Sequence, residues 1–242
     1  MSIRDNYLTV MENIAAACAQ CGRGEGEVKL ITVTKFVDTG RIAEAVAAGA
    51  RHVGENRAQE FRDKLDFFKE NGLDAHLIGQ LQTNKVKYVI GNASLIQSVD
   101  RLELAREISR LAVKAGITQN VLAEVNIGGE AAKSGFAPED IPSAIEAAAG
   151  FEHIFLRGLM AIPPKCSRAE ENIPFFCRMQ KLFIDNGEKK YDNVAMDFLS
   201  MGMSADYPAA IACGSNMVRV GTAIFGARNY GPINGAASGG NG

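Results

Sequence analysis

The sequence has 242 residues, 47% of them hydrophobic and 22% charged, a balance typical of soluble globular proteins at a length close to that of a single (β/α)8 barrel. Its 26 basic and 28 acidic side chains give a net charge of -2, which argues against a nucleic-acid surface, and no apolar run reaches membrane-spanning length. The first residues lead into an amphipathic pattern rather than a signal peptide, so we expect a cytoplasmic protein that binds neither nucleic acid nor membrane.

The cysteines and histidines predict neither a disulfide framework nor a metal site. The five cysteines are odd in number and irregular in spacing. Cys18 and Cys21 have the spacing of a redox or zinc pair, but no second pair completes a metal site. We interpret both as small apolar residues at the end of a helix.

Hydrophobic periodicity divides the chain into alternating strands and helices. A helix with apolar residues at helical spacing precedes the first strand, and helices follow the strands. The predicted strands are 28–34, 52–56, 76–80, 94–99, 120–127, 154–160, 197–201 and 217–220. The predicted helices are about 7–21, 39–49, 58–69, 85–90, 104–115, 138–149, 174–187 and 204–211, with a short helical turn over 221–226.

Eight strands that alternate with helices predict a parallel sheet closed into one (β/α)8 barrel with an extra N-terminal helix, over residues 1–230. The alternative is an open, doubly wound sheet. That fold would normally place a Gly-rich fingerprint after the first strand, where this chain has Lys35-Phe-Val-Asp. Residues 231–242 are Gly-rich and without periodicity, so we expect a disordered tail there.

Lys35 ends the first predicted strand, a run of mostly β-branched and apolar residues. If its ammonium group is partly desolvated, its pKa falls, and the free amine becomes a nucleophile toward aldehydes such as pyridoxal phosphate (PLP). The alternative is a strand-end lysine whose ammonium group reaches solvent.

The segments after the seventh and eighth strands have the composition of a phosphate site. In such barrels these two loops often hold a phosphate, together with a short extra helix. Here they contain Ser200-Met-Gly-Met-Ser204 and Gly221-Thr222. Glycines allow close approach of an anion, and hydroxyl and backbone N–H groups donate to it. The alternative is two ordinary turns, with Ser204 as the N-cap of the next helix.

Arg219 lies in the eighth strand between Val218 and Val220. Its side chain points into the barrel if the valines point outward, and it then needs a phosphate, a carboxylate or a ring nitrogen as acceptor. The alternative is an outward salt bridge.

Long motifs in this chain resemble the pyridoxal phosphate homeostasis protein family. The resemblance runs in order from about residue 5 to Asn229. It departs at Gln80, where many members have proline, and at Phe36, where a small polar residue is common. The motifs are Val33-Thr-Lys35, Gly54-Glu-Asn56, His76-Leu-Ile-Gly-Gln-Leu-Gln-Thr-Asn-Lys85, Val125-Asn-Ile-Gly, Lys133-Ser-Gly135, Arg157-Gly-Leu-Met-Ala-Ile-Pro163, Leu199-Ser-Met-Gly-Met-Ser204 and Met217-Val-Arg-Val-Gly-Thr-Ala-Ile-Phe-Gly226.

The resemblance implies a barrel like the N-terminal domain of bacterial alanine racemase. It implies that Lys35 holds pyridoxal 5'-phosphate as a Schiff base and that Arg219 faces the pyridine nitrogen. It places Ser204, Gly221 and Thr222 on the phosphate. It also places Asn56, His76 and Met160 at strand ends, lining the pocket, and makes Lys133 a candidate for PLP transfer, the alternative for Lys133 being a solvated loop lysine.

The function implied is that of a PLP carrier or buffer in vitamin B6 and amino-acid homeostasis, without catalytic turnover, with apo PLP-dependent enzymes as possible recipients. One alternative is an amino-acid racemase that uses the same Lys35. Racemisation needs two positioned bases. In alanine racemase the second is a tyrosine from another domain, which we expect this chain to lack because the barrel extends to about Asn229. A third alternative is a phosphate-binding barrel with no aldehyde ligand.

Overall fold

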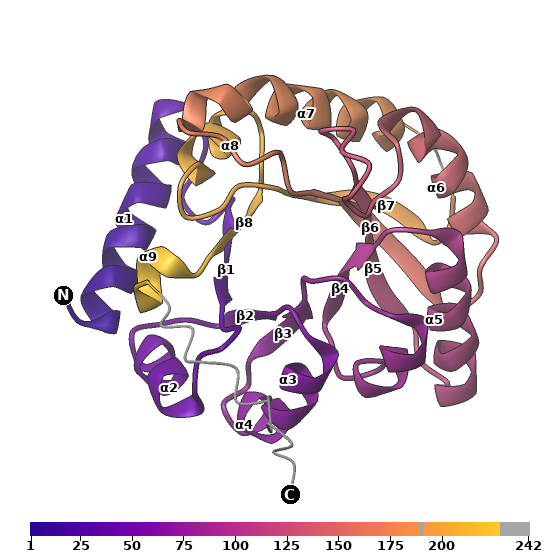
Figure 1. The fold of residues 1–242 in the computed structure, drawn as a ribbon, viewed down its shortest axis with the longest axis horizontal. Coiled ribbons are helices and arrows are strands. Elements are labelled where there is room, and N and C mark those ends of the chain that lie inside the picture. The colour runs from indigo at the N-terminus through magenta and orange to yellow at the C-terminus, as the bar shows by residue number, and fades with distance from the viewer. Residues whose placement is uncertain (189–190, 228–242) are drawn as a thin grey trace, which may run out of the picture.

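The computed structural model describes residues 1–188 and 191–227. In that part of the chain, eight strands form a closed barrel in sequence order, and each is parallel to its neighbours (Figure 1). The predicted (β/α)8 barrel is confirmed. The strands are β1 Lys29–Val33, β2 His52–Glu55, β3 Asp74–Leu77, β4 Leu95–Val99, β5 Gln119–Val125, β6 Ile154–Ala161, β7 Val194–Ser200 and β8 Met217–Val220.

Helices surround the barrel on the outside, and α1 lies beside α2, α8 and α9 (Figure 1). The α-helices are α1 Ile3–Gln20, α2 Thr39–Ala47, α3 Ala58–Asp63, α4 Leu65–Glu70, α5 Leu102–Ala115, α6 Ile141–Ala149, α7 Ile173–Gly187, α8 Tyr207–Ala212 and α9 Thr222–Phe225. The 3-10 helices are η1 Thr83–Tyr88, η2 Pro138–Asp140 and η3 Ala169–Asn172. In the described residues no helix is both long enough and apolar enough to cross a bilayer.

The barrel has two hydrophobic layers because residues along each strand point alternately outward and inward. The larger cluster packs between the strands and the helices, while Ile31, Leu122 and Met217 belong to a smaller cluster inside the barrel. Polar side chains interrupt the inner cluster, and among them Gln97 and Ser200 are fully buried. Such groups are costly to bury unless they are hydrogen-bonded, so their partners matter to the site described below.

Two local predictions were wrong. The helix predicted over 58–69 is two helices, because the backbone of Lys64 leaves helical geometry. At this break the Lys64 ammonium group donates to the Thr34 carbonyl and the Glu55 carboxylate. The N-cap position of α8 belongs to Asp206 rather than Ser204. The predicted tail, residues 231–242, lies outside the described residues.

Candidate functional site

A cavity of about 260 Å³ lies at the carboxyl ends of the strands. It brings together six of the residues singled out in the sequence, namely Lys35, Asn56, Ser204, Arg219, Gly221 and Thr222. The remaining lining residues are Val33, Ile78, Ile162, Met203 and Ala205. Residues from β1, β8 and the loops after β2, β3, β6 and β7 therefore converge on one space, at the end where barrels of this kind carry their functional sites.

Lys35 lies in a turn directly after β1 and is half-buried. The next residue, Phe36, has a positive φ of 59°, which is uncommon for a bulky side chain. This backbone is held from α3, because the Phe36 N–H donates to the Glu60 carboxylate across 2.8 Å. Strained turns persist only where the surroundings determine them, and they concentrate at functional sites.

A buried ion pair supports the residue before Lys35. The Glu55 carboxylate is fully buried and accepts from the Thr34 hydroxyl and from the Lys64 ammonium group, both at 2.7 Å. Lys64 also donates to the Thr34 carbonyl at 2.9 Å. Burial raises the pKa of Glu55, and the nearby Lys64 charge opposes that rise. The turn that carries Lys35 is thus tied to β2 and to the break between α3 and α4.

Arg219 is the cation in this cavity whose surroundings are most enclosed. Its guanidinium group points into the barrel, donating to the Ser200 hydroxyl at 2.6 Å and to the Ala161 carbonyl at 2.9 Å. Burial lowers the pKa of Arg219 to about 10, so it keeps its proton at neutral pH. These two bonds use two of its five N–H donors, which leaves donor capacity for an acceptor in the cavity.

Glu124, on β5, is a buried acid whose pKa is linked to Arg219. Burial and the nearby Asp100 raise the pKa of Glu124 to about 7, while the positive charge of Arg219 lowers it. The Ser134 hydroxyl donates to one carboxylate oxygen at 3.5 Å, and the other oxygen has no hydrogen-bond partner among the described residues. An acid in this state changes charge near neutral pH.

Ser204 joins the two loops predicted to hold a phosphate. Its hydroxyl oxygen accepts from the backbone N–H groups of Gly221 and Ala223, both at 3.3 Å. These N–H groups belong to the start of α9, the predicted short helical turn. Gly202 helps to shape the preceding loop, because its φ is 94° and an added Cβ would lie 2.6 Å from the Ala210 Cβ. Hydroxyl and backbone N–H groups therefore gather at one side of the cavity.

The remaining predicted site residues fall in different places. Asn56 lines the cavity. Its backbone packs closely against Gly79, where a Cβ atom would lie 2.4 Å from the Asn56 carbonyl oxygen. His76 and Met160 lie within β3 and β6 rather than at their ends, and neither lines this cavity. Met160 packs in the inner hydrophobic cluster, and His76 lines a cavity at the opposite end of the barrel. Their proposed contact with PLP stays a prediction.

Lys133 lies at a neighbouring cavity that shares Ile162, Met203 and Ala205 with the candidate site. Its ammonium group pairs with Glu130 at 2.7 Å and donates to the Pro163 carbonyl at 3.2 Å. Lys133 therefore borders the space next to the candidate site, and its ammonium group is held by Glu130 of its own loop and by Pro163 of the segment after β6.

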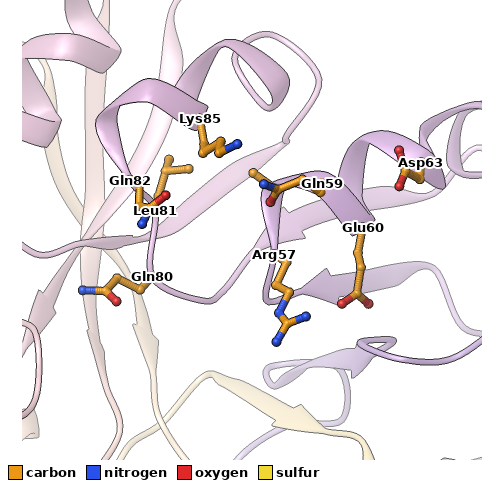
Figure 2. A pocket seen from close by; sticks show the side chains of 9 residues that line it. Arg57, Gln59, Glu60, Asp63, Gln80, Leu81, Gln82 and Lys85 are labelled. Atoms are coloured by element: carbon orange, nitrogen blue, oxygen red, sulfur yellow. The ribbon is translucent and has the colours of Figure 1, made fainter. Parts of the chain in front are cut away.

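A third cavity at this end of the barrel, of about 520 Å³, is lined mainly by charged and amide side chains (Figure 2). Arg57 and Glu60 come from the start of α3, and Gln80 and Lys85 come from the segment after β3. The Arg57 guanidinium lies 5.0 Å from the centre of the Phe36 ring. Gln80, one departure from the family pattern, thus lines this third cavity and not the candidate site.

At the sequence level, Ser200 was given only as part of the predicted phosphate segment, and Glu124 was missed. Ser200 binds Arg219, and Glu124 adjusts the charge around it. Period-two alternation along the strands carried the signal, because Ser200 follows Phe198 and Glu124 follows Leu122 on the inward face. Ile162 and Met203 were not predictable as lining residues, because their positions depend on loop conformation.

Residues 8–229 match the family model described as alanine racemase, N-terminal domain. The pyridoxal phosphate homeostasis protein of Aquifex aeolicus is 44% identical over 230 residues, covering 95% of this chain and all of that protein. The Escherichia coli protein of the same name is 39% identical over 231 residues, covering 94% of this chain and 97% of that one. The chain belongs to the pyridoxal phosphate homeostasis protein family.

Solved structures agree with this family membership. PipY from Synechococcus elongatus, solved with PLP bound, has a TM-score of 0.76 and 32% identity, covering 88% of this chain and all of that one. A protein described as unknown, from Bifidobacterium adolescentis, has a TM-score of 0.85 and 40% identity, covering 92% of this chain and 94% of that one. Alanine racemase from Clostridium difficile, at 20% identity and a TM-score of 0.67 over 93% of this chain and 60% of that one, shares the fold.

Proposed function

We propose that this chain binds pyridoxal 5'-phosphate in the cavity at the carboxyl ends of the strands and acts as a PLP carrier or buffer. One observation carries the proposal: a single cavity gathers a lysine amine, a buried arginine and a turn rich in N–H and hydroxyl groups. These three features match the aldehyde, the ring nitrogen and the phosphate of PLP. The name of the family and PLP in the PipY structure support it.

The residues present fit this cofactor chemically. Arg219 retains N–H donors and is enclosed by the barrel, so it suits an acceptor such as the pyridine nitrogen. The N–H groups of Gly221 and Ala223 now bind the Ser204 hydroxyl, which stands where a phosphate oxygen could accept. PLP, when bound, supplies an aldehyde that can condense with the Lys35 amine to an imine, with loss of water.

The chain's own residues would hold and orient the cofactor. The Thr34, Glu55 and Lys64 contacts fix the turn that presents Lys35, and the Ser200 and Ala161 contacts fix the guanidinium of Arg219. We place no catalytic turnover in this function. The proposal includes transfer of PLP to apo PLP-dependent enzymes and a cytoplasmic location.

Sodium borohydride reduction tests the PLP site directly. Protein incubated with PLP and reduced should gain the mass of one reduced cofactor, and peptide mapping should place it on Lys35. Lys35→Ala should lose this adduct while its unfolding curve stays close to that of the unmodified protein, since the side chain lies at a half-buried turn outside the packed core. Lys114→Ala, at an exposed position of α5, is the matched control. An adduct of equal stoichiometry in Lys35→Ala would contradict the proposal.

A further inference from the structure

The cavity lined by His76, which we call the second cavity below, has a volume of about 190 Å³ and lies at the other end of the barrel. Its walls come from the first residues of several strands, among them Lys29 of β1, His52 of β2 and Asp74 of β3. The amino-terminal ends of parallel strands in a barrel lie at the face opposite the carboxyl ends. This cavity is therefore separated from the candidate cofactor site by the barrel interior, and its volume suits about six water-sized groups.

A continuous series of buried hydrogen bonds connects the two cavities through the barrel. Arg219 donates to the Ser200 hydroxyl at 2.6 Å, and that hydroxyl donates to the Gln97 side-chain oxygen at 2.7 Å. The Gln97 amide lies 2.9 Å from Nδ1 of His76. We call these four residues, Arg219, Ser200, Gln97 and His76, the axial chain. All four are at least 95% buried.

The direction of these bonds determines what His76 offers to the second cavity. Because the Gln97 oxygen accepts from Ser200, its NH2 group must donate to Nδ1 of His76. Burial lowers the pKa of His76 to about 3, so the ring is neutral and its single proton is on Nε2. Nε2 has no hydrogen-bond acceptor among the described residues. The imidazole therefore presents one unused N–H donor where His76 lines the cavity.

Lys29 is the cation of this cavity that lacks an ion-pair partner in the described part of the chain. Arg157 pairs with Asp197 at 2.5 Å, and the Asp74 carboxylate lies 3.0 Å from Nδ1 of His52, a hydrogen-bond partner whose pKa is lowered by burial. The Lys29 ammonium group instead lies 6.0 Å from the centre of the Phe198 ring. Its charge lowers the pKa of both His52 and His76, and all three side chains line this cavity.

The remaining wall is mixed. Leu95, Phe198 and Met217 form an apolar side, whereas Ser94 and Asn120 add polar side chains to the same cavity. With the Asp74 carboxylate engaged by His52, the Lys29 charge and the neutral His76 donor suit a single carboxylate group with two acceptor oxygens, and the apolar side suits a short hydrocarbon part. A small aliphatic carboxylate combines these features, whereas inorganic phosphate lacks the apolar part and carries more charge than Lys29 can match.

We propose that the cavity at the amino-terminal ends of the strands is a second ligand site, for a small aliphatic monocarboxylate, and that its occupancy is coupled through the axial chain to Arg219. The carboxylate accepts from Lys29 and from Nε2 of His76. Polarisation along connected hydrogen bonds, together with the fixed geometry of the axial chain, carries the effect to the guanidinium group. The coupling rests on the proposed PLP function, whereas the binding does not.

Ligand-observed NMR with sodium propionate tests the binding on the full chain without PLP. We expect saturable binding that weakens at least tenfold in Lys29→Met, persists in Lys29→Arg and is unchanged in Lys114→Met, an exposed lysine on α5. Phosphate and propylammonium should bind more weakly than propionate. Absence of saturable propionate binding up to about 100 mM, or equal affinity in Lys29→Met, would overturn the site.

A PLP titration with and without saturating propionate tests the coupling. Propionate should shift the PLP dissociation constant by roughly fivefold or more, the usual range for coupled sites, and PLP should shift propionate affinity equally. Gln97→Met, which interrupts the axial chain, should show no propionate-dependent shift of the PLP dissociation constant, measured at a propionate concentration that saturates the variant. An unchanged PLP constant in the unmodified protein would overturn the coupling. Failure to bind PLP at all would instead contradict the proposed function and leave the propionate result standing.

Discussion

Arg219 donates to the hydroxyl of Ser200 across 2.6 Å, inside the barrel, where both side chains are buried. The Ser200 hydroxyl in turn donates to the Gln97 side-chain oxygen, so the hydroxyl orients Arg219 and is itself oriented by Gln97. Without the bond to Ser200, the Ala161 carbonyl would be the one remaining hydrogen-bond acceptor of the guanidinium among the described residues. The position of the donor that we assign to the pyridine nitrogen thus depends on a residue that does not line the cavity.

Ser200→Ala should therefore weaken PLP binding while leaving the borohydride adduct on Lys35. A hydrogen bond to a charged group contributes about 1.5–3 kcal/mol, so we expect a loss of roughly 10- to 150-fold in affinity. Absorbance titration with PLP measures it. Ser109→Ala removes a hydroxyl that donates to the Glu152 carbonyl outside the site and should leave PLP affinity unchanged. Equal affinities in the two variants would contradict the positioning role of Ser200.

The ion pair beside Lys35 predicts a large effect on stability. Lys64→Met would leave the Glu55 carboxylate fully buried with the Thr34 hydroxyl as its remaining donor. Losing one partner of a buried pair costs about 3–5 kcal/mol of unfolding free energy. The double variant Glu55→Gln with Lys64→Met removes the stranded charge and should recover most of that loss. Urea denaturation provides the measurement, and Lys69→Met, at an exposed position of α4, is the control.

If Lys64→Met and Lys69→Met unfold at the same urea concentration, the pair does not support the turn. A large loss that the double variant fails to recover would mean that packing of the Lys64 side chain, rather than its charge, is what matters.

Much of the barrel could be predicted from the residues because its signals are local. Period-two and period-3.6 patterns gave the strands and helices, and β8 has the predicted bounds. The break at Lys64 could not be predicted, since the partner of its side chain there is Glu55 on another element. The place of Ser204 was ambiguous for the same reason, because its partners are the N–H groups of Gly221 and Ala223.

The candidate site shows the same division. Lys35 and the turn at Gly221 could be singled out because strand ends in a barrel converge on one face. His76 was expected at that face, but its side chain lines the cavity at the amino-terminal ends of the strands, where Nδ1 lies 2.9 Å from the Gln97 amide. Because His76 is one residue from the carboxyl end of β3, its position along the strand alone did not indicate which cavity it lines.

Glu124 predicts a pH dependence of stability with an unusual sign. Its folded pKa of about 7 lies above the ordinary value of 4.5, so between these pH values the folded chain holds a proton that the unfolded chain has released. The unfolding free energy contributed by Glu124 therefore falls as pH rises through this window, by at most about 1.4 kcal/mol per pH unit.

Glu124→Gln should remove that fall, so the variant gains stability relative to the unmodified protein between pH 4.5 and pH 8. Urea denaturation at the two pH values gives the difference directly. Glu146→Gln, on the exposed side of α6, should show the same change in unfolding free energy between the two pH values as the unmodified protein. If Glu124→Gln shows that same change as well, the pKa of Glu124 is not raised in the folded state.

The phosphate turn predicts selectivity for PLP over pyridoxal. Pyridoxal offers no anion to the Ser204 hydroxyl or to the N–H groups at Gly221 and Thr222. Each charge-assisted hydrogen bond lost is worth roughly 1.5–3 kcal/mol, so PLP should bind at least tenfold more tightly. Ser204→Ala should lower the ratio of PLP affinity to pyridoxal affinity, and Ser143→Ala, at an exposed position of α6, should leave that ratio unchanged. Direct titration with equal affinities for both aldehydes would show that the phosphate site is misplaced.

The last prediction is that the chain does not racemise amino acids. Racemisation removes the α-proton on one face of the bound substrate and returns one on the other, so it needs two positioned proton-transfer groups. Among the described residues that line the cavity, Lys35 can fill one such role. Arg219, with a pKa of about 10, remains a donor at neutral pH, and the other lining side chains are apolar, hydroxyl or amide groups.

PLP-loaded protein incubated with L-alanine in deuterated water provides the test, with an alanine racemase as positive control. Chiral chromatography follows the D-isomer, and mass spectrometry follows deuterium at the α-carbon. A single base can exchange the α-proton with retention, so slow deuterium uptake into L-alanine agrees with the cavity as described. Formation of D-alanine at about 1 per second or faster, within the usual range of enzymes, and its loss in Lys35→Ala would contradict the carrier function and establish a racemase.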